Sequence, residues 1–264
     1  MKLSFDVSDT QDETFFGREG SGAIEYRERT FESECFHNRT AEVLDWDTES
    51  FPELFGEFID EKGFVSGDLL YLRLPADDIG AIQAAEAAGF YFIESSIIPF
   101  LKTRHWDRRR YERYVCPMVE IDDERIGEVK EIAQATFRGL RFNLDPHVGD
   151  QRADERYLRW LMNAYEGGED ICAIMHHGSV AGFSLLRHED GGKTVFRLAG
   201  MRPDLKNAGL GMMLYASTVA RCQDRGVKHI DGGISMANCP VLNVMANLGF
   251  SFRDPTIVFH YYVE

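Results

Sequence analysis

FRLAGMRPDLKNAGLG, residues 196–211, joins a strand pattern to the start of a helix. Apolar residues alternate through Lys193–Met201, which predicts a strand, and Pro203 stops the alternation. An apolar run over Met212–Ala220 then leads to a basic end and a glycine, as in a helix and its C-cap. The sequence therefore predicts a strand, a glycine-containing turn and a helix in direct succession.

The turn has the features of an anion site. The first N–H groups of a helix lack intrahelical partners and lie at the positive end of its dipole, while Gly209 and Gly211 allow close approach to the backbone. A diphosphate fits this description. The segment lacks the Gly-Lys-Ser/Thr ending of a P-loop, and its glycine spacing differs from that of a dinucleotide fingerprint. A plain connection between strand and helix remains the alternative.

A second motif follows the first. Lys228–Ile234 is predicted to form a strand, and Asn238 is predicted to cap a helix that has Pro240 in its first turn. The helix should end at Gly249, and two further strand patterns follow at Ser251–Arg253 and Thr256–Val263.

Together these motifs resemble the GCN5-related N-acetyltransferase (GNAT) family. KNAGLG is similar to its (Gln/Arg)-x-x-Gly-x-(Gly/Ala) signature, with Lys206 in the first place. The spacing from Asn238 to Gly249-Phe250 is similar to its second motif, and the likeness covers Val119–Glu264. The resemblance implies an α/β (α+β) fold: a mixed, mostly antiparallel twisted sheet flanked by helices, and possibly a tandem of two such units.

The resemblance also implies acetyl-CoA as co-substrate and direct attack of an amine on its thioester. The strand would pair with the pantetheine amides, a backbone N–H near Met201 would hold the thioester oxygen, and the turn would hold the pyrophosphate. The residues implied to bind acetyl-CoA are Leu198, Ala199, Gly200, Met201, Lys206, Asn207, Ala208, Gly209, Leu210, Gly211, Met212 and Asn238.

Three further segments resemble the TDP-fucosamine acetyltransferase type, which acetylates amino sugars on nucleotide carriers. They are FRGLRFNLDP from Phe137, ERYLRWLMNA from Glu155 and VAGFSLL from Val180. Each could equally belong to the scaffold. The residues expected to contact such a substrate are Arg138, Arg141, Asp145 and His147.

The proton-transfer groups are less defined. Many family members have a tyrosine seven residues after the asparagine, and here that position is Met245, whose thioether cannot donate a proton. Tyr215, His260, Tyr261 and Cys239 are alternative acids, and Asp231, Asp145 and His147 are alternative bases. Asp231, Tyr261 and His260 are the catalytic residues predicted, with structural roles as the competing interpretation of each.

The N-terminal half resembles the closing part of the C-terminal half. IQAAEAAGFYFIESSIIPFLK and LNVMANLGFSFRDPTIVFHYY both give a helix, Gly-Phe and strand patterns, in the first copy Tyr91–Ser95 and Ser96–Lys102. An internal repeat is predicted, with two unrelated helix-to-strand joints as the alternative. A break near His105–Cys116 predicts a degenerate domain at 1–110 and a catalytic domain at 116–264.

Composition limits the partners. The 264 residues carry 44 acidic and 29 basic side chains, a net charge of -15 that repels nucleic acid and attracts cationic amines, unless it only solvates the surface. With no run of 18 apolar residues and no signal-peptide pattern, neither a membrane span nor export is expected. Five scattered cysteines fit a reducing cytoplasm.

No metal site is predicted, because Cys172, His176 and His177 lack zinc spacing. Three functions remain open: an N-acetyltransferase acting on a small-molecule amine, a non-catalytic acyl-CoA-binding or regulatory module, and a tandem-GNAT aminoacyl transferase. The acidic charge argues against the third, and a homodimer is possible.

Overall fold

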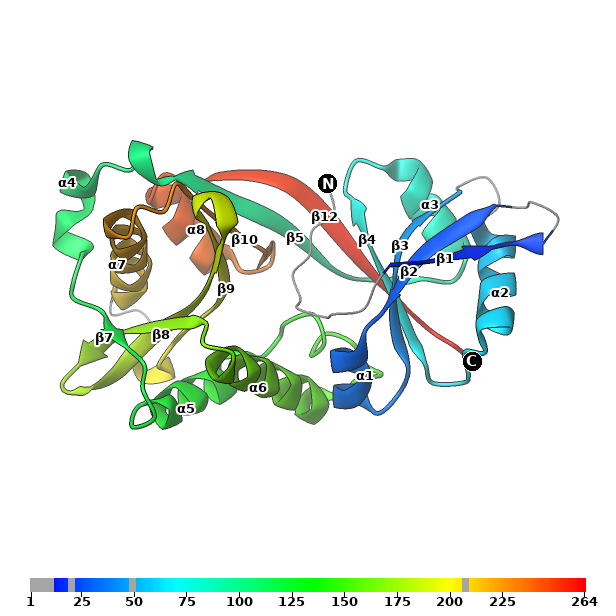
Figure 1. The fold of residues 1–264 in the computed structure, drawn as a ribbon, viewed down its shortest axis with the longest axis horizontal. Helices are drawn as coiled ribbons and strands as arrows, with labels where there is room; N and C mark the ends of the chain where they lie inside the picture. The colour runs from blue at the N-terminus through cyan, green and yellow to red at the C-terminus, as the bar shows by residue number, and fades with distance from the viewer. Residues whose placement is uncertain (1–11, 19–21, 48–50, 206–208) are drawn as a thin grey trace. The chain divides into compact units, whose positions relative to one another are not determined.

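The chain folds into two compact units (Figure 1). The computed structural model describes residues 12–18, 22–47, 51–205 and 209–264. Unit 1 consists of the chain up to Ser96 together with Leu144–Val148 and Asp254–Glu264. Unit 2 consists of Ile97–Asn143 and Gly149–Arg253. The units therefore exchange segments along the sequence, and each is described by itself.

Unit 1 contains a mixed sheet in the order β1-β2-β3-β4-β12-β5. The pairs β1–β2, β2–β3 and β4–β12 are antiparallel, and β3–β4 is parallel. The strands are β1 (Glu13–Phe16), β2 (Ala23–Glu28), β3 (Thr40–Trp46), β4 (Leu69–Pro75), and parts of β5 (Tyr91–Lys102) and β12 (Ser251–Tyr262). The helices are α1 (Thr30–Phe36), α2 (Phe51–Lys62) and α3 (Ile79–Ala87).

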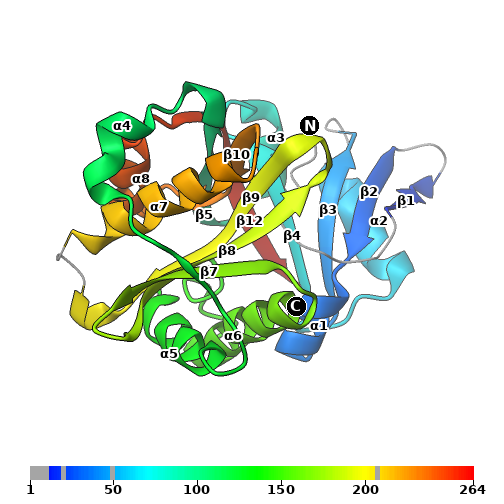
Figure 2. The ribbon, with the colours of Figure 1, turned by 60° about the vertical axis from the view of Figure 1, so that its left-hand side comes forward.

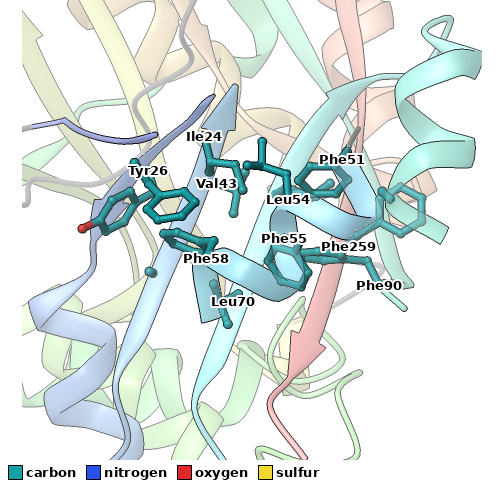
Figure 3. Packing of buried hydrophobic residues seen from close by; sticks show 14 of the residues in the cluster. Ile24, Tyr26, Val43, Phe51, Leu54, Phe55, Phe58, Leu70, Phe90 and Phe259 are labelled. Atoms are coloured by element: carbon teal, nitrogen blue, oxygen red, sulfur yellow. The ribbon is translucent and has the colours of Figure 1, made fainter. Parts of the chain in front are cut away.

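The apolar core of unit 1 lies between α2 and one face of this sheet (Figure 3). Phe51, Phe55 and Phe58 recur at helical spacing on α2 and are buried against Leu70 and Leu72 of β4. Because side chains alternate along a strand, the residues between these leucines face the other side of the sheet. That second face carries the polar residues described below.

Unit 2 contains a sheet in the order β5-β10-β9-β8-β7-β6, with β11 pairing to β5. From β5 through β10, β9, β8 and β7 to β6 the neighbouring strands are antiparallel, except that β9 and β10 are parallel. The strands are β6 (Val119–Glu120), β7 (Asp170–His176), β8 (Ser179–Glu189), β9 (Lys193–Met201), β10 (His229–Gly232) and β11 (Ile234–Ser235). The helices are α4 (Arg108–Tyr111), α5 (Ile126–Thr136), α6 (Asp150–Glu166), α7 (Leu210–Asp224) and α8 (Cys239–Asn247).

Helices cover both faces of this second sheet. Figure 2 shows α5 and α6 on one face of β7–β9 and α7 on the other, and α7 shares its apolar cluster with α8. The predicted fold class, a mixed and mostly antiparallel sheet flanked by helices, is confirmed. The predicted strand Lys193–Met201 is observed as well, and β7 and β8 form an antiparallel hairpin.

The predicted repeat is present in the backbone. The side chain of Asp78 caps the N-terminus of α3, and that of Asn238 caps the N-terminus of α8, each by accepting a hydrogen bond from a backbone N–H. A glycine with positive φ follows the end of each helix. The N–H of Phe90 then donates to Ala85 at 3.0 Å, and that of Phe250 donates to Met245 at the same distance. Each helix leads into a strand of 12 residues, β5 or β12.

Two sequence expectations differ from the structure here. Each pair of short strand patterns forms one continuous strand, β5 or β12. In β12 the pairing continues past Asp254, which has a positive φ, since the Ala76 N–H donates to the Pro255 carbonyl. The contacts also divide the chain after Ser96 and after Arg253 instead of near 105–116. The physical reason is that β5 and β12 each begin in one unit and end in the other.

Candidate functional site

The central feature of unit 2 is the divergence of its two parallel strands. The pairing of β9 with β10 begins where Lys193 lies opposite His229 and ends where Phe196 lies opposite Gly232. Beyond that point β9 continues to Met201 and pairs only with β8. The approach at the last pair is close, since a Cβ on Gly232 would lie 2.6 Å from the Phe196 carbonyl oxygen. The end of β9 therefore has an edge that no described strand occupies.

The hydrogen bonds between β9 and β8 show which backbone N–H groups of β9 face this open edge. A β-bulge at Leu185/Leu186 leaves Arg197 as the extra residue of β9, at the point where β10 departs. The Arg202 N–H donates to the Ala181 carbonyl on the β8 side. Because N–H groups alternate along a strand, those of Ala199 and Met201 point to the open edge. The predicted stretch Leu198–Met201 thus offers two donors there.

Along the chain, α7 is the next α-helix after the end of β9. Gly209 precedes it with a φ of 75°, a left-handed conformation that glycine adopts without strain. A Cβ on Gly209 or on Gly211 would meet nothing within 4 Å, so the backbone of the first turn is accessible. Leu210 and Met212 provide two of its N–H groups. Lys206, Asn207 and Ala208 lie outside the described residues.

An apolar cluster lies under the predicted cofactor residues. Met245 of α8 and Tyr215 of α7 are both buried in it, and Ala199 and Met212 pack against it. The Tyr215 ring lies 5.7 Å from that of Phe196, and burial raises the pKa of its hydroxyl, so it stays protonated. Met245 is a core residue, and Tyr215 is the alternative acid that shares its cluster.

The other residues predicted in unit 2 have structural partners. The Asn238 side chain accepts from the Val241 N–H at 3.4 Å, which confirms it as the N-cap of α8. Asp231 lies opposite Val195 within the paired part of β10 and forms ion pairs with Lys193 at 3.5 Å and Arg253 at 3.4 Å. Both partners of these ion pairs belong to the scaffold of the sheet. Its predicted role as a base gains no geometric support.

Two buried arginines border β9 and α6. Arg197 packs over Trp160, with 4.8 Å from its guanidinium carbon to the ring centroid, and pairs with Glu169 at 3.1 Å. Arg156 packs over Phe142 and Trp160. Sequence reasoning did not select Arg156 or Arg197, since scattered arginines give no spacing signal. The predicted Arg141 is buried and stacks on Phe142, whereas Arg138 is exposed.

A separate polar constellation belongs to unit 1. Asp145 and His147, on the α5–α6 connection, meet His260 of β12. One Asp145 oxygen, Oδ2, bonds to the Nδ1 of His260 and accepts from the Tyr262 hydroxyl at 3.3 Å. The other, Oδ1, accepts from the His147 N–H at 2.9 Å and from the Tyr91 hydroxyl at 3.3 Å. Three predicted residues thus share one site.

Burial and charge define this constellation. The side chains of Asp145 and His260 are both 0% exposed, whereas that of His147 is 53% exposed. Burial alone would raise the pKa of the Asp145 carboxyl, but hydrogen bonds from His260 and His147 hold it below its usual range. Asp145 is therefore a buried anion whose charge is stabilised by the two histidines.

Tyr261 does not join this site. Its ring packs at 5.0 Å from Phe55 and 5.4 Å from Phe90, in the apolar core of unit 1. The reason is strand alternation, because His260 and Tyr261 are consecutive and point to opposite faces of β12. The same rule identifies Tyr262 as a neighbour of His260, which sequence reasoning missed, as it missed Tyr91.

Neither a metal site nor a membrane-spanning helix is found among the residues that the structure describes. Among those residues, no three His, Cys, Asp or Glu side chains gather as a metal site would require. None of the helices described there is long and apolar enough to cross a bilayer.

Comparisons with known proteins agree with this geometry. Residues 102–238, more than half of the chain, match the model of the acetyltransferase (GNAT) domain family. The chain is 20% identical over 249 residues to the spore coat polysaccharide biosynthesis protein SpsD of Bacillus subtilis (strain 168), covering 90% of this chain and 83% of that protein.

Two solved structures have a similar fold. A GCN5-related N-acetyltransferase from Sphaerobacter thermophilus aligns with a TM-score of 0.61 and 10% identity, over 94% of this chain and 79% of that one. A tandem GNAT protein from the clavulanic acid biosynthesis pathway aligns with a TM-score of 0.58 and 14% identity, over 96% and 83%. With the family match and the diverging strands of unit 2, the chain belongs to the GNAT acetyltransferase family.

Proposed function

We propose that the protein transfers the acetyl group of acetyl-CoA to a primary amine of a small molecule. The observation that carries this proposal is the end of the β9–β10 pairing at Phe196–Gly232, beside an open backbone edge on β9. A strand edge binds an extended amide chain through main-chain hydrogen bonds, and the pantetheine arm is such a chain.

The residues of unit 2 would divide the work between them. The N–H groups of Ala199 and Met201 bind pantetheine and the thioester oxygen, on which negative charge develops during attack. The first turn of α7, after Gly209, binds the pyrophosphate through its N–H groups and dipole. Lys206, Asn207, Ala208 and Asn238 remain predicted contacts of the cofactor.

An amino sugar on a nucleotide carrier is the acceptor that we propose. The similar protein SpsD is a spore coat polysaccharide biosynthesis protein, which supports a sugar as the acceptor. A nucleotide carrier is anionic, and the predicted contact residue Arg141 lies with Arg156 around Phe142 in unit 2. Guanidinium groups bind phosphate through paired hydrogen bonds, so this arginine pair suits such an acceptor.

Calorimetric titration with acetyl-CoA tests the proposal, with Gly211→Ala as the diagnostic variant. An added methyl group meets no atom within 4 Å in the protein but lies where the pyrophosphate would approach. Loss of one charge-assisted hydrogen bond corresponds to about tenfold weaker binding. Gly127→Ala is the matched control, since Gly127 also is the second residue of its helix, α5, and also has open space.

Release of the CoA thiol in the presence of TDP-fucosamine, glucosamine and spermidine completes the test. The expected result is thiol release with at least one of these amines. Equal affinity of Gly211→Ala and wild type for acetyl-CoA would contradict the assigned pyrophosphate site. Tight acetyl-CoA binding with no thiol release would favour the second candidate, a non-catalytic acyl-CoA-binding module. The buried Met245, in place of a proton donor, is the observation that favours it.

A further inference from the structure

We propose that Thr136, the last residue of α5, is a positioning residue for the acetyl-CoA thioester. Its hydroxyl donates to the Met201 carbonyl at 3.0 Å, and Met201 is the last residue of β9. The inference rests on the acetyl transfer proposed above and names a side chain that holds the donor groups of that reaction in place. Both residues belong to unit 2.

The Met201 carbonyl faces the open edge of β9. A trans peptide bond is planar, so this carbonyl points away from the N–H of the next residue, Arg202. The Arg202 N–H donates to the Ala181 carbonyl of β8 at 2.9 Å. The Met201 carbonyl therefore points to the same edge as the N–H groups of Ala199 and Met201, and the Thr136 hydroxyl lies at that edge.

The peptide unit between Met201 and Arg202 is thus held from both sides. β8 binds its N–H, and α5 binds its carbonyl. The preceding peptide unit, between Gly200 and Met201, presents an N–H that we assign to the cofactor. Donors that are fixed before the reaction stabilise the developing negative charge without a cost of reorganisation. Thr136 orients these donors through the backbone.

The packing of α5 supports this role. A Cβ on Gly200 would lie 3.2 Å from Ile132 Cγ2, so the helix lies close against the end of β9. Glu128 accepts from the Val180 N–H of β8 at 2.7 Å. Glu128, Ile132 and Thr136 recur every four residues and share one face of α5. One face of the helix therefore fixes the ends of both strands.

The Thr136 bond also limits how a ligand can pair with the edge. In order, the edge presents the N–H and carbonyl of Ala199 and then the N–H and carbonyl of Met201. Thr136 donates to the last of these groups. An extended chain that avoids this hydroxyl accepts from the two N–H groups and donates to the Ala199 carbonyl between them. The pantetheine arm carries the carbonyl and amide groups for such pairing.

Thr136→Val tests the assignment, because valine has nearly the shape of threonine and lacks the hydroxyl. With TDP-fucosamine or glucosamine as acceptor, kcat/KM for thiol release should fall about tenfold, the equivalent of one hydrogen bond. The loss should be mainly in kcat, because the donors act on charge that develops during attack. Calorimetric affinity for acetyl-CoA should fall as well. Thr136→Ser keeps the hydroxyl and should restore both quantities.

Thr103→Val is the matched control for the loss of a threonine hydroxyl. The buried Thr103 donates to the Lys228 carbonyl at 3.1 Å, beside the start of β10 and not at the open edge. Thermal unfolding should show a loss of stability in both valine variants. Only Thr136→Val should lose kcat and acetyl-CoA affinity.

The outcomes separate this role from the proposed function. Unchanged kcat/KM and affinity in Thr136→Val, or equal losses in Thr103→Val, overturn the role of Thr136 alone. Failure of wild type to bind acetyl-CoA overturns the proposed function and this role together. If wild type binds acetyl-CoA but releases no thiol with any amine, the transfer is overturned, and the affinities of the two valine variants decide whether Thr136 positions the edge.

Discussion

Asp145 is a single carboxylate that connects three parts of unit 1. It is completely buried, yet it accepts hydrogen bonds from two histidines and two tyrosines. Each donor compensates part of the cost of removing the charge from water. On β3 and β4 the polar face continues through Glu42 and Tyr71, which lie directly opposite one another, and Tyr71 lies opposite His260. These hydrogen bonds hold the loop that bears His147.

Asp145→Asn should therefore lower the free energy of unfolding by about 3 kcal/mol at pH 7, as for other buried ion pairs that lose one partner. The folded-state pKa of Asp145 is lowered, so its contribution is fully present above the ordinary carboxyl pKa near 4 and is lost as the pH falls through the folded-state pKa. Urea unfolding of both proteins from pH 7 to pH 3 measures the difference.

The difference between the two proteins should be constant at neutral pH and shrink in acid. Asp204→Asn serves as the control, because Asp204 pairs with Arg202 at the exposed surface, where solvent screens the pair, and its effect should be much smaller than that of Asp145→Asn. A difference for Asp145→Asn that stays the same down to pH 3 would contradict the assignment of a lowered pKa.

At the scale of elements, the close contact between β9 and β10 determines where the free edge begins. Gly232→Ala would place a methyl group 2.6 Å from the Phe196 carbonyl oxygen and 3.1 Å from its Cβ, and backbone atoms cannot move aside easily. We expect a loss of about 1–3 kcal/mol in unfolding free energy. Acetyl-CoA affinity should fall as well, because the separated strands displace the Ala199 and Met201 donors.

Thermal unfolding and calorimetric titration of Gly232→Ala measure the two effects. Gly56→Ala provides the opposite case, since Gly56 is exposed within α2 and its added Cβ meets nothing within 4 Å. It should raise the unfolding free energy by up to about 1 kcal/mol through helix propensity. If Gly232→Ala is as stable as wild type, the strands do not approach as closely as described.

The elements of unit 2 were largely predictable because local signals agree there. Asn238, Gly249 and the alternation along Lys193–Met201 are capping and strand signals within a few residues of the structures they specify. The meeting of Asp145 with His260 was not predictable, because it depends on the register of β12 against β4 across a long sequence separation. Strand alternation alone, however, excludes His260 and Tyr261 from sharing one site.

At the scale of the molecule, the two units repeat one plan and exchange their last strands. In each unit, antiparallel strands lead along the sheet to one parallel pair, β3–β4 or β9–β10. The second strand of that pair then has an antiparallel neighbour on its other edge. That strand comes from the other half of the sequence: β12 pairs with β4, and β5 pairs with β10. Neither predicted domain, 1–110 or 116–264, contains every strand of one unit.

Removal of residues 254–264 should therefore disrupt unit 1, although it is otherwise N-terminal. The deletion removes Phe259 from the core, His260 from Asp145 and the partner of β4. Amide hydrogen exchange should show lost protection along β4, whereas deletion of the exposed Glu264 alone should leave it unchanged. Retained protection of β4 after the larger deletion would show that unit 1 does not need β12.

The exchanged strands also set an order for folding in the cell. β4 is synthesised early, but its partner β12 leaves the ribosome about 190 residues later, since Tyr71 pairs with His260. During translation β4 has an unpaired edge of the kind that promotes association between chains. We therefore expect unit 1, although most of it is translated first, to complete its fold only after nearly all of unit 2 has emerged.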